Sequence, residues 1–243
     1  MDRGLEIAAS GMLTEMVRQD SIAGDLANAS TPGYKPQVIS QSSFGDALNA
    51  AGATGHALDL VGNGAQISQT SVDMTQAPLE STGEPLDFAL QGPGFMAVQT
   101  ANGTLYTRDG QFGVDAKGEL VTSTGDPVLN SAGKAIDVGS DSTDLKVSST
   151  GAITANGKSL GSFDVVSLTN PTKVGDNYFA GTPGAKPAAT TVNQGSLESS
   201  AVNPTTVMID MIVSLRAYEA SQRVIHSIDE TLQRGVDGAG GVS

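Results

Sequence analysis

The chain of 243 residues has no cysteine and no tryptophan, and it has only two histidines. Without cysteine it forms no disulfide bond and offers no thiol nucleophile or thiolate ligand. His56 lies in a polar segment and His226 in a helical one, so neither builds a Ser–His–Asp or His–carboxylate set. Asp137, Asp141 and Asp144 lack the spacing and the closing glutamate of a calcium loop. We therefore predict no catalytic residue, no cofactor, no metal and no enzyme activity.

A glycine-rich fingerprint is present, but it lacks its structural setting. Residues 92–97 read Gly-Pro-Gly-Phe-Met-Ala, which fits the dinucleotide-binding pattern. That pattern binds phosphate only where its second half opens a helix with free amide groups. Here Pro93 removes an amide, and the run that starts at Phe95 is typical of a strand. We therefore reject a nucleotide cofactor.

Long apolar runs and positive charge are both scarce. No run approaches the ~18 residues of a membrane-spanning helix, and the start lacks the charged, apolar and cleavage regions of a secretory signal. We expect no membrane insertion and no cleaved signal peptide. Lysine and arginine number 13 against 26 acidic residues, which gives a net charge of -13. That charge argues against nucleic acid and anionic lipid as partners.

The most regular stretch runs from Asn203 to about Arg234 and predicts a long helix. Asn203 is a good N-cap, because its side-chain oxygen accepts from a free amide of the first turn. Pro204 suits the first helical position. At ~1.5 Å per residue the helix is roughly 45 Å long. An apolar stripe follows it at spacings of three, four and seven residues, formed by Met208, Met211, Ile212, Leu215, Tyr218, Ile225, Ile228 and Leu232.

A second helical pattern covers residues 2–29. Its stripe has smaller side chains, namely Leu5, Ala8, Ala9, Met12, Leu13, Met16, Ala23, Leu26 and Ala27. Gly4, Gly11 and Gly24 each cost on the order of 1 kcal/mol relative to alanine, so this helix depends on packing. The two helices have similar lengths and matching stripes. We therefore expect them to pair as a coiled coil, with the rest of the chain looped out between them.

The middle of the chain predicts an extended connector followed by a β domain. Residues 36–78 are poor in apolar side chains and rich in small polar ones, which is typical of a connector. From Leu79 apolar and polar residues alternate, and Asn102-Gly103 and Asp109-Gly110 mark tight turns. Many short strands with glycine-centred turns predict an all-β sandwich or barrel-like domain over residues 79–197.

The predicted fold class is therefore α+β, with an all-β domain inserted between two long terminal helices. The helical segments are residues 1–35 and residues 198–243. The connector and the β domain fill the sequence between them.

Short blocks of residues stand in a recognisable order along almost the whole chain. Near the start they are Ala9-Ser10-Gly11-Met12, Leu26-Ala27-Asn28 and Thr31-Pro32-Gly33-Tyr34-Lys35. In the middle they are Pro85-Leu86-Asp87-Phe88, Tyr106-Thr107-Arg108-Asp109-Gly110 and Gly118-Glu119-Leu120. Near the end they are Leu197-Glu198-Ser199-Ser200-Ala201-Val202-Asn203 and Arg216-Ala217-Tyr218-Glu219. In this order they closely resemble the bacterial flagellar rod and hook axial protein family.

The resemblance implies a structural subunit of the flagellar basal-body rod. The chain is too short for the extra outer domains of hook proteins, which favours the single-β-domain rod proteins (the FlgF/FlgG type). The connector lacks the longer insertion common in distal rod proteins, which favours the proximal type. The family assembles helically through its terminal helices around the export channel, and it transmits torque for motility.

The resemblance also implies partners and a location. The partners are copies of this chain, other rod and hook axial proteins, and the flagellar type III export machinery. The location is the periplasm-spanning rod of the basal body, reached without a cleaved signal peptide.

The site residues follow from the same resemblance and from the two stripes. Asn28, Thr31, Gly33 and Tyr34 are expected to form the turn that leaves the inner tube. Arg216, Tyr218 and Glu219 are expected to contact neighbouring subunits, or alternatively to pack within one subunit's own coiled coil. The other predicted subunit-interface residues are Leu5, Met12, Met16, Leu26, Met208, Met211, Ile212, Leu215, Ile225 and Leu232.

A second hypothesis is a glycan- or peptidoglycan-binding β domain with a helical dimerisation module. Such a site needs exposed aromatic side chains. The chain has no tryptophan, and Phe88, Phe95, Phe112 and Phe163 alternate as core residues do. A structural rod subunit is therefore the favoured interpretation.

Overall fold

A computed structural model describes residues 2–43, 65–139, 145–155, 157–175, 177–187 and 189–240. The expectations that concern residues 44–64, including His56, and those for Asp141 and Asp144, lie outside these ranges. Clustering of contacts divides the chain into two units. The first unit takes in Met1–Ala27, Gln37–Ser71 and Asn203–Ser243, and the second takes in Asn28–Pro36 and Val72–Val202. The predicted division at residues 35, 78 and 197 stays a prediction.

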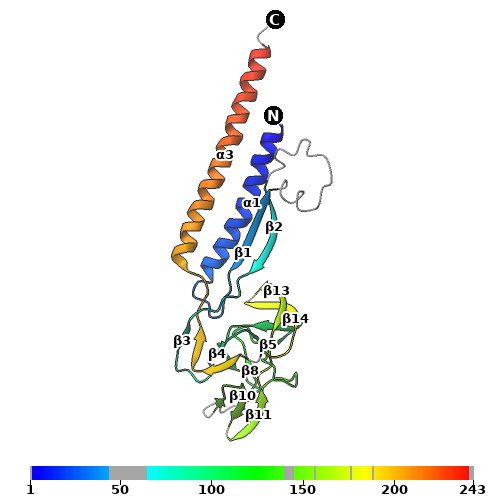
Figure 1. The fold of residues 1–243 in the computed structure, drawn as a ribbon, viewed down its shortest axis with the longest axis vertical. Helices are drawn as coiled ribbons and strands as arrows, with labels where there is room; N and C mark the ends of the chain where they lie inside the picture. The colour runs from blue at the N-terminus through cyan, green and yellow to red at the C-terminus, as the bar shows by residue number, and fades with distance from the viewer. Residues whose placement is uncertain are drawn as a thin grey trace. The chain divides into compact units, whose positions relative to one another are not determined.

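The first unit contains two long helices and a two-stranded sheet (Figure 1). The helices are α1 (Asp2–Ala27) and α3 (Pro204–Gly240), and the strands are β1 (Gln37–Ser43) and β2 (Ala65–Val72). The predicted N-cap of the second helix is confirmed. Asn203 Oδ1 accepts from the backbone N–H of Thr205 at 3.0 Å and of Thr206 at 3.3 Å, which satisfies two amides that the helix leaves without partners.

The predicted coiled coil is wrong. The helices α1 and α3 lie side by side (Figure 1), but small and polar residues occupy the centre of the seam between them. Ser214 is fully buried there and donates to the carboxylate of Glu15 at 2.6 Å. A Cβ added to Gly11 would lie 3.7 Å from Ser221 Oγ. Coiled coils instead bury large apolar knobs at this seam.

Several large apolar side chains of the predicted stripe point away from this seam. Met208, Ile212 and Leu215 are 52%, 52% and 44% exposed. On a helix of 3.6 residues per turn they are rotated by roughly 100–160° from Ser214. Met211, Tyr218 and Ile225 of the seven-residue spacing are half-buried on the serine side, whereas the three exposed residues, which fill intermediate steps of the stripe, lie outside it.

The second unit is a mostly β body. Its strands are β3 (Leu79–Ser81), β4 (Phe88–Gln91), β5 (Phe95–Thr100), β6 (Gly103–Thr107), β7 (Gly113–Val114), β8 (Leu120–Val121), β9 (Leu145–Val147), β10 (Ala152–Ala155), β11 (Lys158–Ser162), β12 (Val165–Val166), β13 (Leu168–Gly175), β14 (Tyr178–Pro183), β15 (Thr191–Gln194) and β16 (Ser196–Glu198).

The predicted single sandwich or barrel is wrong, although the β-rich character is as expected. The largest sheet has five strands in the order β12-β5-β6-β14-β13, and β9, β10 and β11 form a three-stranded sheet. Three further pairs, β15-β4, β16-β3 and β7-β8, form two-stranded sheets. The strands are too short to continue one ladder, because glycine turns interrupt them. Gly118 and Gly125 have φ of 87° and 89°, a conformation that glycine adopts without strain.

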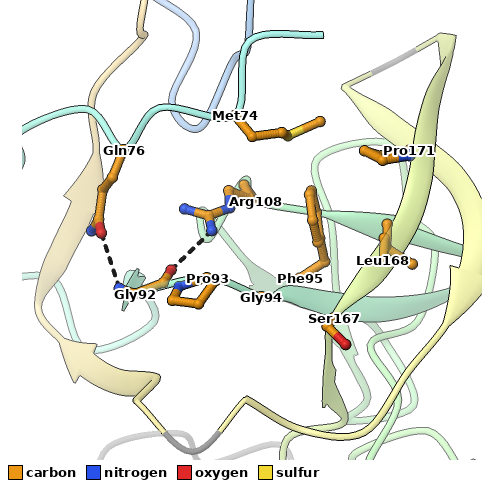
Figure 2. Close-up of a pocket in the computed structure, with 10 residues that line it drawn as sticks. All are labelled: Met74, Gln76, Gly92, Pro93, Gly94, Phe95, Arg108, Ser167, Leu168 and Pro171. Atoms are coloured by element: carbon orange, nitrogen blue, oxygen red, sulfur yellow. Dashed lines mark hydrogen bonds between the residues drawn. The ribbon is translucent and has the colours of Figure 1, made fainter. Parts of the chain in front are cut away.

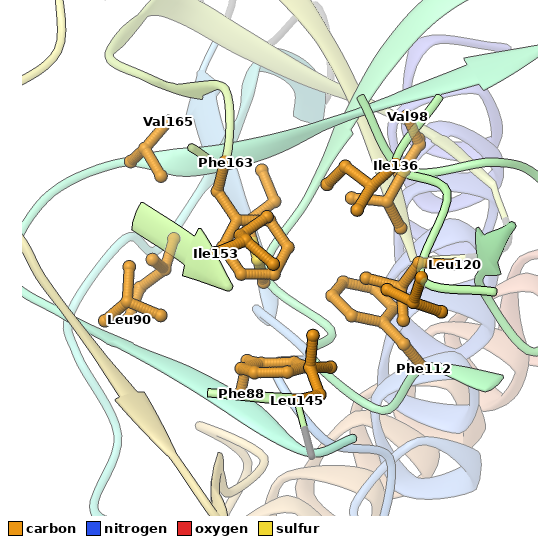
Figure 3. Close-up of a cluster of buried hydrophobic side chains, with 14 of the residues drawn as sticks. Phe88, Leu90, Val98, Phe112, Leu120, Ile136, Leu145, Ile153, Phe163 and Val165 are labelled. Atoms are coloured by element: carbon orange, nitrogen blue, oxygen red, sulfur yellow. The ribbon is translucent and has the colours of Figure 1, made fainter. Parts of the chain in front are cut away.

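Aromatic side chains form the centre of the β body (Figure 3). The ring of Phe88 lies 5.1 Å from that of Phe163 and 6.0 Å from that of Phe112, measured between centroids. Phe95 packs against Phe179 in a second cluster at 5.4 Å. All five rings are buried. They are therefore core residues, and none of them offers the exposed platform that a glycan site needs.

Candidate functional site

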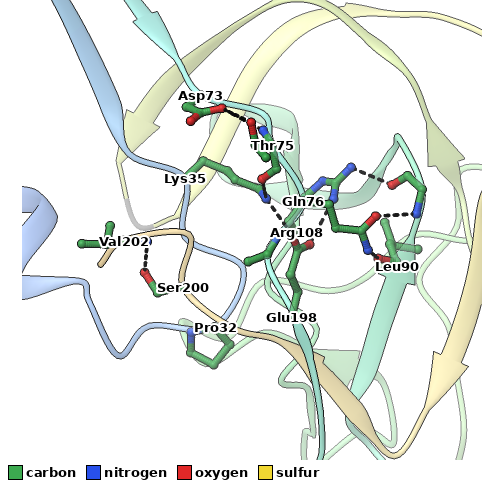
Figure 4. Close-up of polar contacts among 12 residues, drawn as sticks. Pro32, Lys35, Asp73, Thr75, Gln76, Leu90, Arg108, Glu198, Ser200 and Val202 are labelled. Atoms are coloured by element: carbon green, nitrogen blue, oxygen red, sulfur yellow. Dashed lines mark hydrogen bonds and ion pairs between the residues drawn. The ribbon is translucent and has the colours of Figure 1, made fainter. Parts of the chain in front are cut away.

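Three charged side chains of the β body meet away from solvent (Figure 4). Lys35 follows the Thr-Pro-Gly-Tyr turn, Arg108 follows β6, and Glu198 ends β16. Lys35 Nζ lies 2.6 Å from Glu198 Oε1, and Arg108 Nη1 lies 3.0 Å from Glu198 Oε2. The side chains of Lys35 and Glu198 are fully buried, and that of Arg108 is 4% exposed. We call these three residues the ion cluster.

The backbone around the ion cluster fixes its geometry. The N–H of Gly33 donates to the carbonyl of Glu198 at 2.7 Å, and the N–H of Ala201 donates to the carbonyl of Tyr34 at 3.0 Å. Gly33 has φ of 66°, and a Cβ there would lie 2.4 Å from the carbonyl oxygen of Arg108. Only glycine fits this position without displacing backbone. The turn is thus held between the strand ends that carry Arg108 and Glu198.

Most polar atoms of the ion cluster have further partners. Lys35 Nζ also donates to the carbonyl of Thr75 at 2.6 Å, and Glu198 Oε1 accepts from the N–H of Ala77 at 2.9 Å. Arg108 Nη2 donates to the carbonyl of Gly92 at 2.9 Å. Burial lowers the pKa of the Lys35 amine, and the hydrogen bond and charge of Glu198 oppose that change. The cluster therefore joins separate segments of the chain.

The four predicted turn residues lie together, packed within their own chain. Thr31 Oγ1 donates to Asn28 Oδ1 at 3.1 Å, and both side chains are half-buried. Gly33 and Tyr34 are buried. The amine of Lys173 lies 3.4 Å from the centroid of the Tyr34 ring, which is a cation–π contact. These contacts explain the turn within one subunit, and a role in subunit contacts stays a prediction.

The predicted helix residues separate into two groups. Leu5, Met16, Met208, Ile212, Leu215, Arg216, Glu219 and Leu232 are exposed. Met12, Leu26, Met211, Tyr218 and Ile225 are half-buried. On α3 the half-buried residues lie at three- and four-residue steps from Ser214 and Ser221, which are the positions that face α1. The alternative for Tyr218, packing within its own subunit, agrees with this position.

Exposed apolar side chains are concentrated on the two helices. In the described ranges, fourteen large apolar side chains are exposed, and twelve of them lie on α1 or α3. The other two are Val38 and Val174. We call the twelve the apolar helix faces: Leu5, Ile7, Leu13, Met16 and Val17 on α1, and Met208, Ile209, Ile212, Val213, Leu215, Val224 and Leu232 on α3. Surface apolar residues are normally scattered singly, and a large contiguous group of them marks an interaction site.

The ion cluster was not predicted from the sequence, although each of its members lies in a quoted block. A lysine, an arginine and a glutamate are normally exposed. One local signal was present. Glu198 follows Leu197 at the end of a β-like stretch, and Arg108 follows the apolar run Leu105-Tyr106, so both charges adjoin buried strands.

No helix in the described part of the chain has the length and apolarity needed to cross a membrane. Among the same residues, no group of three or more His, Asp or Glu side chains is arranged to hold a metal ion.

Comparison with known proteins points to one family. Residues 89–155 match the model of the flagellar hook protein FlgE/F/G D1 domain, and residues 193–237 match that of the flagellar basal body rod FlgEFG protein C-terminal region. The flagellar basal-body rod protein FlgG of Bacillus subtilis is 32% identical over 98% of this chain and 99% of its own length. The FlgF protein of Caulobacter vibrioides is 28% identical over the full length of both chains. FlgG of Borreliella burgdorferi is 33% identical over 96% of this chain and 97% of its own.

Proposed function

We propose, from the premise that this chain belongs to the family of flagellar basal-body rod proteins, that its apolar helix faces bind it to other subunits of the rod. The chain is a structural subunit of the flagellar basal-body rod, and its family is not a class of enzymes. It acts in the basal body and assembles with other flagellar axial components.

One observation carries the proposal: twelve of the fourteen exposed large apolar side chains in the described ranges lie on the two helices. Burying one such side chain stabilises an assembly by roughly 1.5–3 kcal/mol. A helix that keeps these residues exposed in one subunit gains most by contact with others. The polar seam at Ser214 and Glu15 supports the same conclusion, because the pair leaves its apolar residues for other subunits.

The finer organisation is also a proposal. The terminal helices repeat in a head-to-tail helical array around the export channel, and the β body faces outward and helps to transmit torque. The rod spans the periplasm, and the subunit reaches it through the flagellar type III export machinery. Copies of this chain and other rod and hook proteins are its neighbours. The short connector between residues 36 and 78 favours the proximal over the distal rod.

The experiment compares Ile212→Asp with Val174→Asp in cells whose own copy of the gene is deleted. Both side chains are exposed, at 52% and 58%, so neither change disturbs a core. Only Ile212 belongs to the apolar helix faces. We expect Ile212→Asp to be produced and folded but absent from purified basal bodies, with swimming abolished, and Val174→Asp to swim.

Normal swimming by the Ile212→Asp strain would refute the proposal. Equal loss of incorporation in both strains would also count against it, because a charge at any exposed apolar site would then be sufficient.

A further inference from the structure

A pocket of about 390 Å³ lies beside the ion cluster in the β body (Figure 2). Its apolar walls include Phe95 of β5 and Leu168 and Pro171 of β13, and Met74 lies at its edge. Arg108 is the one charged residue among the ten that line it. The guanidinium carbon of Arg108 lies 5.3 Å from the centroid of the Phe95 ring. The pocket thus combines apolar walls with a buried cation.

The ion cluster has unequal charge. Lys35 and Arg108 are positive and Glu198 alone is negative, so the three buried side chains carry one excess positive charge. Asp73 attracts Lys35 from nearby, whereas Arg108 is paired in the described residues with Glu198, a carboxylate that it shares with Lys35. Buried charges are stable where they are paired. Because Arg108 shares its carboxylate partner with Lys35, a further anion beside Arg108 is favoured.

Arg108 also has one unused donor. Its Nη1 donates to Glu198 and its Nη2 donates to the carbonyl of Gly92. Its Nε is buried and has no hydrogen-bond partner in the described residues. Buried donors are nearly always satisfied. An acceptor in the pocket that Arg108 lines would complete the set.

We propose that this pocket binds an alkyl carboxylate, which in the assembled rod is an acidic side chain of an adjacent copy of this chain. The apolar walls hold the methylene groups, and Arg108 receives the carboxylate. The second copy is the occupant that charge complementarity favours, because each copy carries a net charge of -13 and presents acids in excess to its neighbours. The identity of the occupant rests on the proposed function, whereas the chemistry of the pocket does not.

The first test uses the isotopically labelled full chain, titrated with pentanoate, 1-pentanol and pentylamine in separate experiments. Amide signals of Gly94 and Leu168 report binding by nuclear magnetic resonance. We expect pentanoate to bind at least about tenfold more tightly than 1-pentanol, and pentylamine not to bind. Equal binding of pentanoate and 1-pentanol, or no response to pentanoate, would overturn the proposal.

Matched variants then test whether a negative charge placed at the pocket weakens the binding of pentanoate. Leu168→Asp places a carboxylate at the pocket, and Leu168→Asn has the same shape without the charge. We expect pentanoate to bind at least about tenfold more weakly to the Asp variant than to the Asn variant. Equal affinities would contradict a role for Arg108. If either variant fails to fold, Pro171→Asp and Pro171→Asn give the same comparison on the half-buried edge of β13.

The last step separates the pocket's occupant from the proposed function. Cells that produce the folded Asp or Asn variant are compared for rod yield and swimming. We expect the Asp variant to yield fewer rods than the Asn variant. If pentanoate binds but both strains swim equally, the adjacent copy is not the occupant. The Ile212→Asp experiment decides independently whether the helix faces assemble the rod.

Discussion

Lys35 and Glu198 are separated by 163 residues in the sequence, yet their charged atoms lie 2.6 Å apart with both side chains fully buried. Lys35 follows α1 at the end of the turn, and Glu198 lies just before α3 begins. The contact therefore joins the two segments of the second unit, Asn28–Pro36 and Val72–Val202. Arg108 and the carbonyl of Thr75 complete its surroundings.

Removing Glu198 should destabilise the β body more than removing Lys35. Glu198→Gln leaves two buried cations without a counter-charge, and breaking a buried pair in this way costs roughly 3–5 kcal/mol. Lys35→Met leaves the Arg108–Glu198 pair balanced, so we expect a loss of about 1–3 kcal/mol from the missing hydrogen bonds. Urea unfolding of both variants measures the difference. A larger loss for Lys35→Met would contradict the described charge balance.

Gly33→Ala should be more destabilising than Gly83→Ala. Both glycines have positive φ, at 66° and 74°, so alanine pays about 1–2 kcal/mol of backbone strain at either position. Only at Gly33 does the new Cβ also meet backbone, 2.4 Å from the carbonyl oxygen of Arg108, whereas Gly83 has open space. We expect a further loss of roughly 1–3 kcal/mol at Gly33 from overpacking. Equal unfolding free energies for the two variants would show that the turn is not packed as described.

Asp109→Asn should change how stability depends on pH. Burial raises the pKa of the Asp109 carboxyl above its ordinary value of about 4, and the charge of Asp87 adds to the effect. The folded state therefore takes up this proton before the unfolded state does as the pH falls. As the pH falls from the folded pKa to about 4, uptake of this proton increases the free energy of unfolding. The free energy of unfolding of the wild type, compared with that of the Asn variant, should be lowest at neutral pH. It should increase as the pH falls to about 4.

Asp73→Asn is the control, because the pKa of Asp73 is shifted in the opposite direction to that of Asp109. The hydroxyl and then the N–H of Thr75 hold the pKa of the Asp73 carboxyl below its ordinary value. Its contribution to stability is present above about 4 and is lost as the pH falls through the lower folded pKa. Urea unfolding from pH 7 to pH 3 measures both variants. Parallel profiles for the two would contradict the burial of Asp109.

Local signals predicted the helices and the β-rich middle correctly. The N-cap at Asn203 and the hairpin before Gly103, which joins β5 to β6, depend on a few neighbouring residues, and sequence patterns report such features well. The helix seam was predicted wrongly, because apolar spacing does not reveal that Ser214 and Ser221 face the partner helix. Met208, Ile212 and Leu215 stay exposed in the single chain, so the usual assumption that large apolar residues meet within one chain fails for them.

The ion cluster could not be predicted for a different reason. Its members come from three distant parts of the chain, and each is of a type that is usually exposed. Their meeting depends on where β6 and β16 end relative to the turn at Gly33, which is a property of the tertiary fold. The predicted turn residues Asn28 and Tyr34 lie close in sequence to Lys35, but no pattern links them to Glu198.

Cysteine labelling tests the central claim most directly, because the chain has no cysteine of its own. Met208→Cys places a thiol on the apolar helix faces at a position that is 52% exposed in one subunit. Ser214→Cys is the control, since Ser214 is already buried. The rate of maleimide reaction is compared between the isolated subunit and intact basal bodies. We expect Cys at 208 to react at least about tenfold more slowly in basal bodies, and Cys at 214 to react slowly in both. Equal, fast labelling at 208 in both samples would contradict subunit contact through the apolar helix faces.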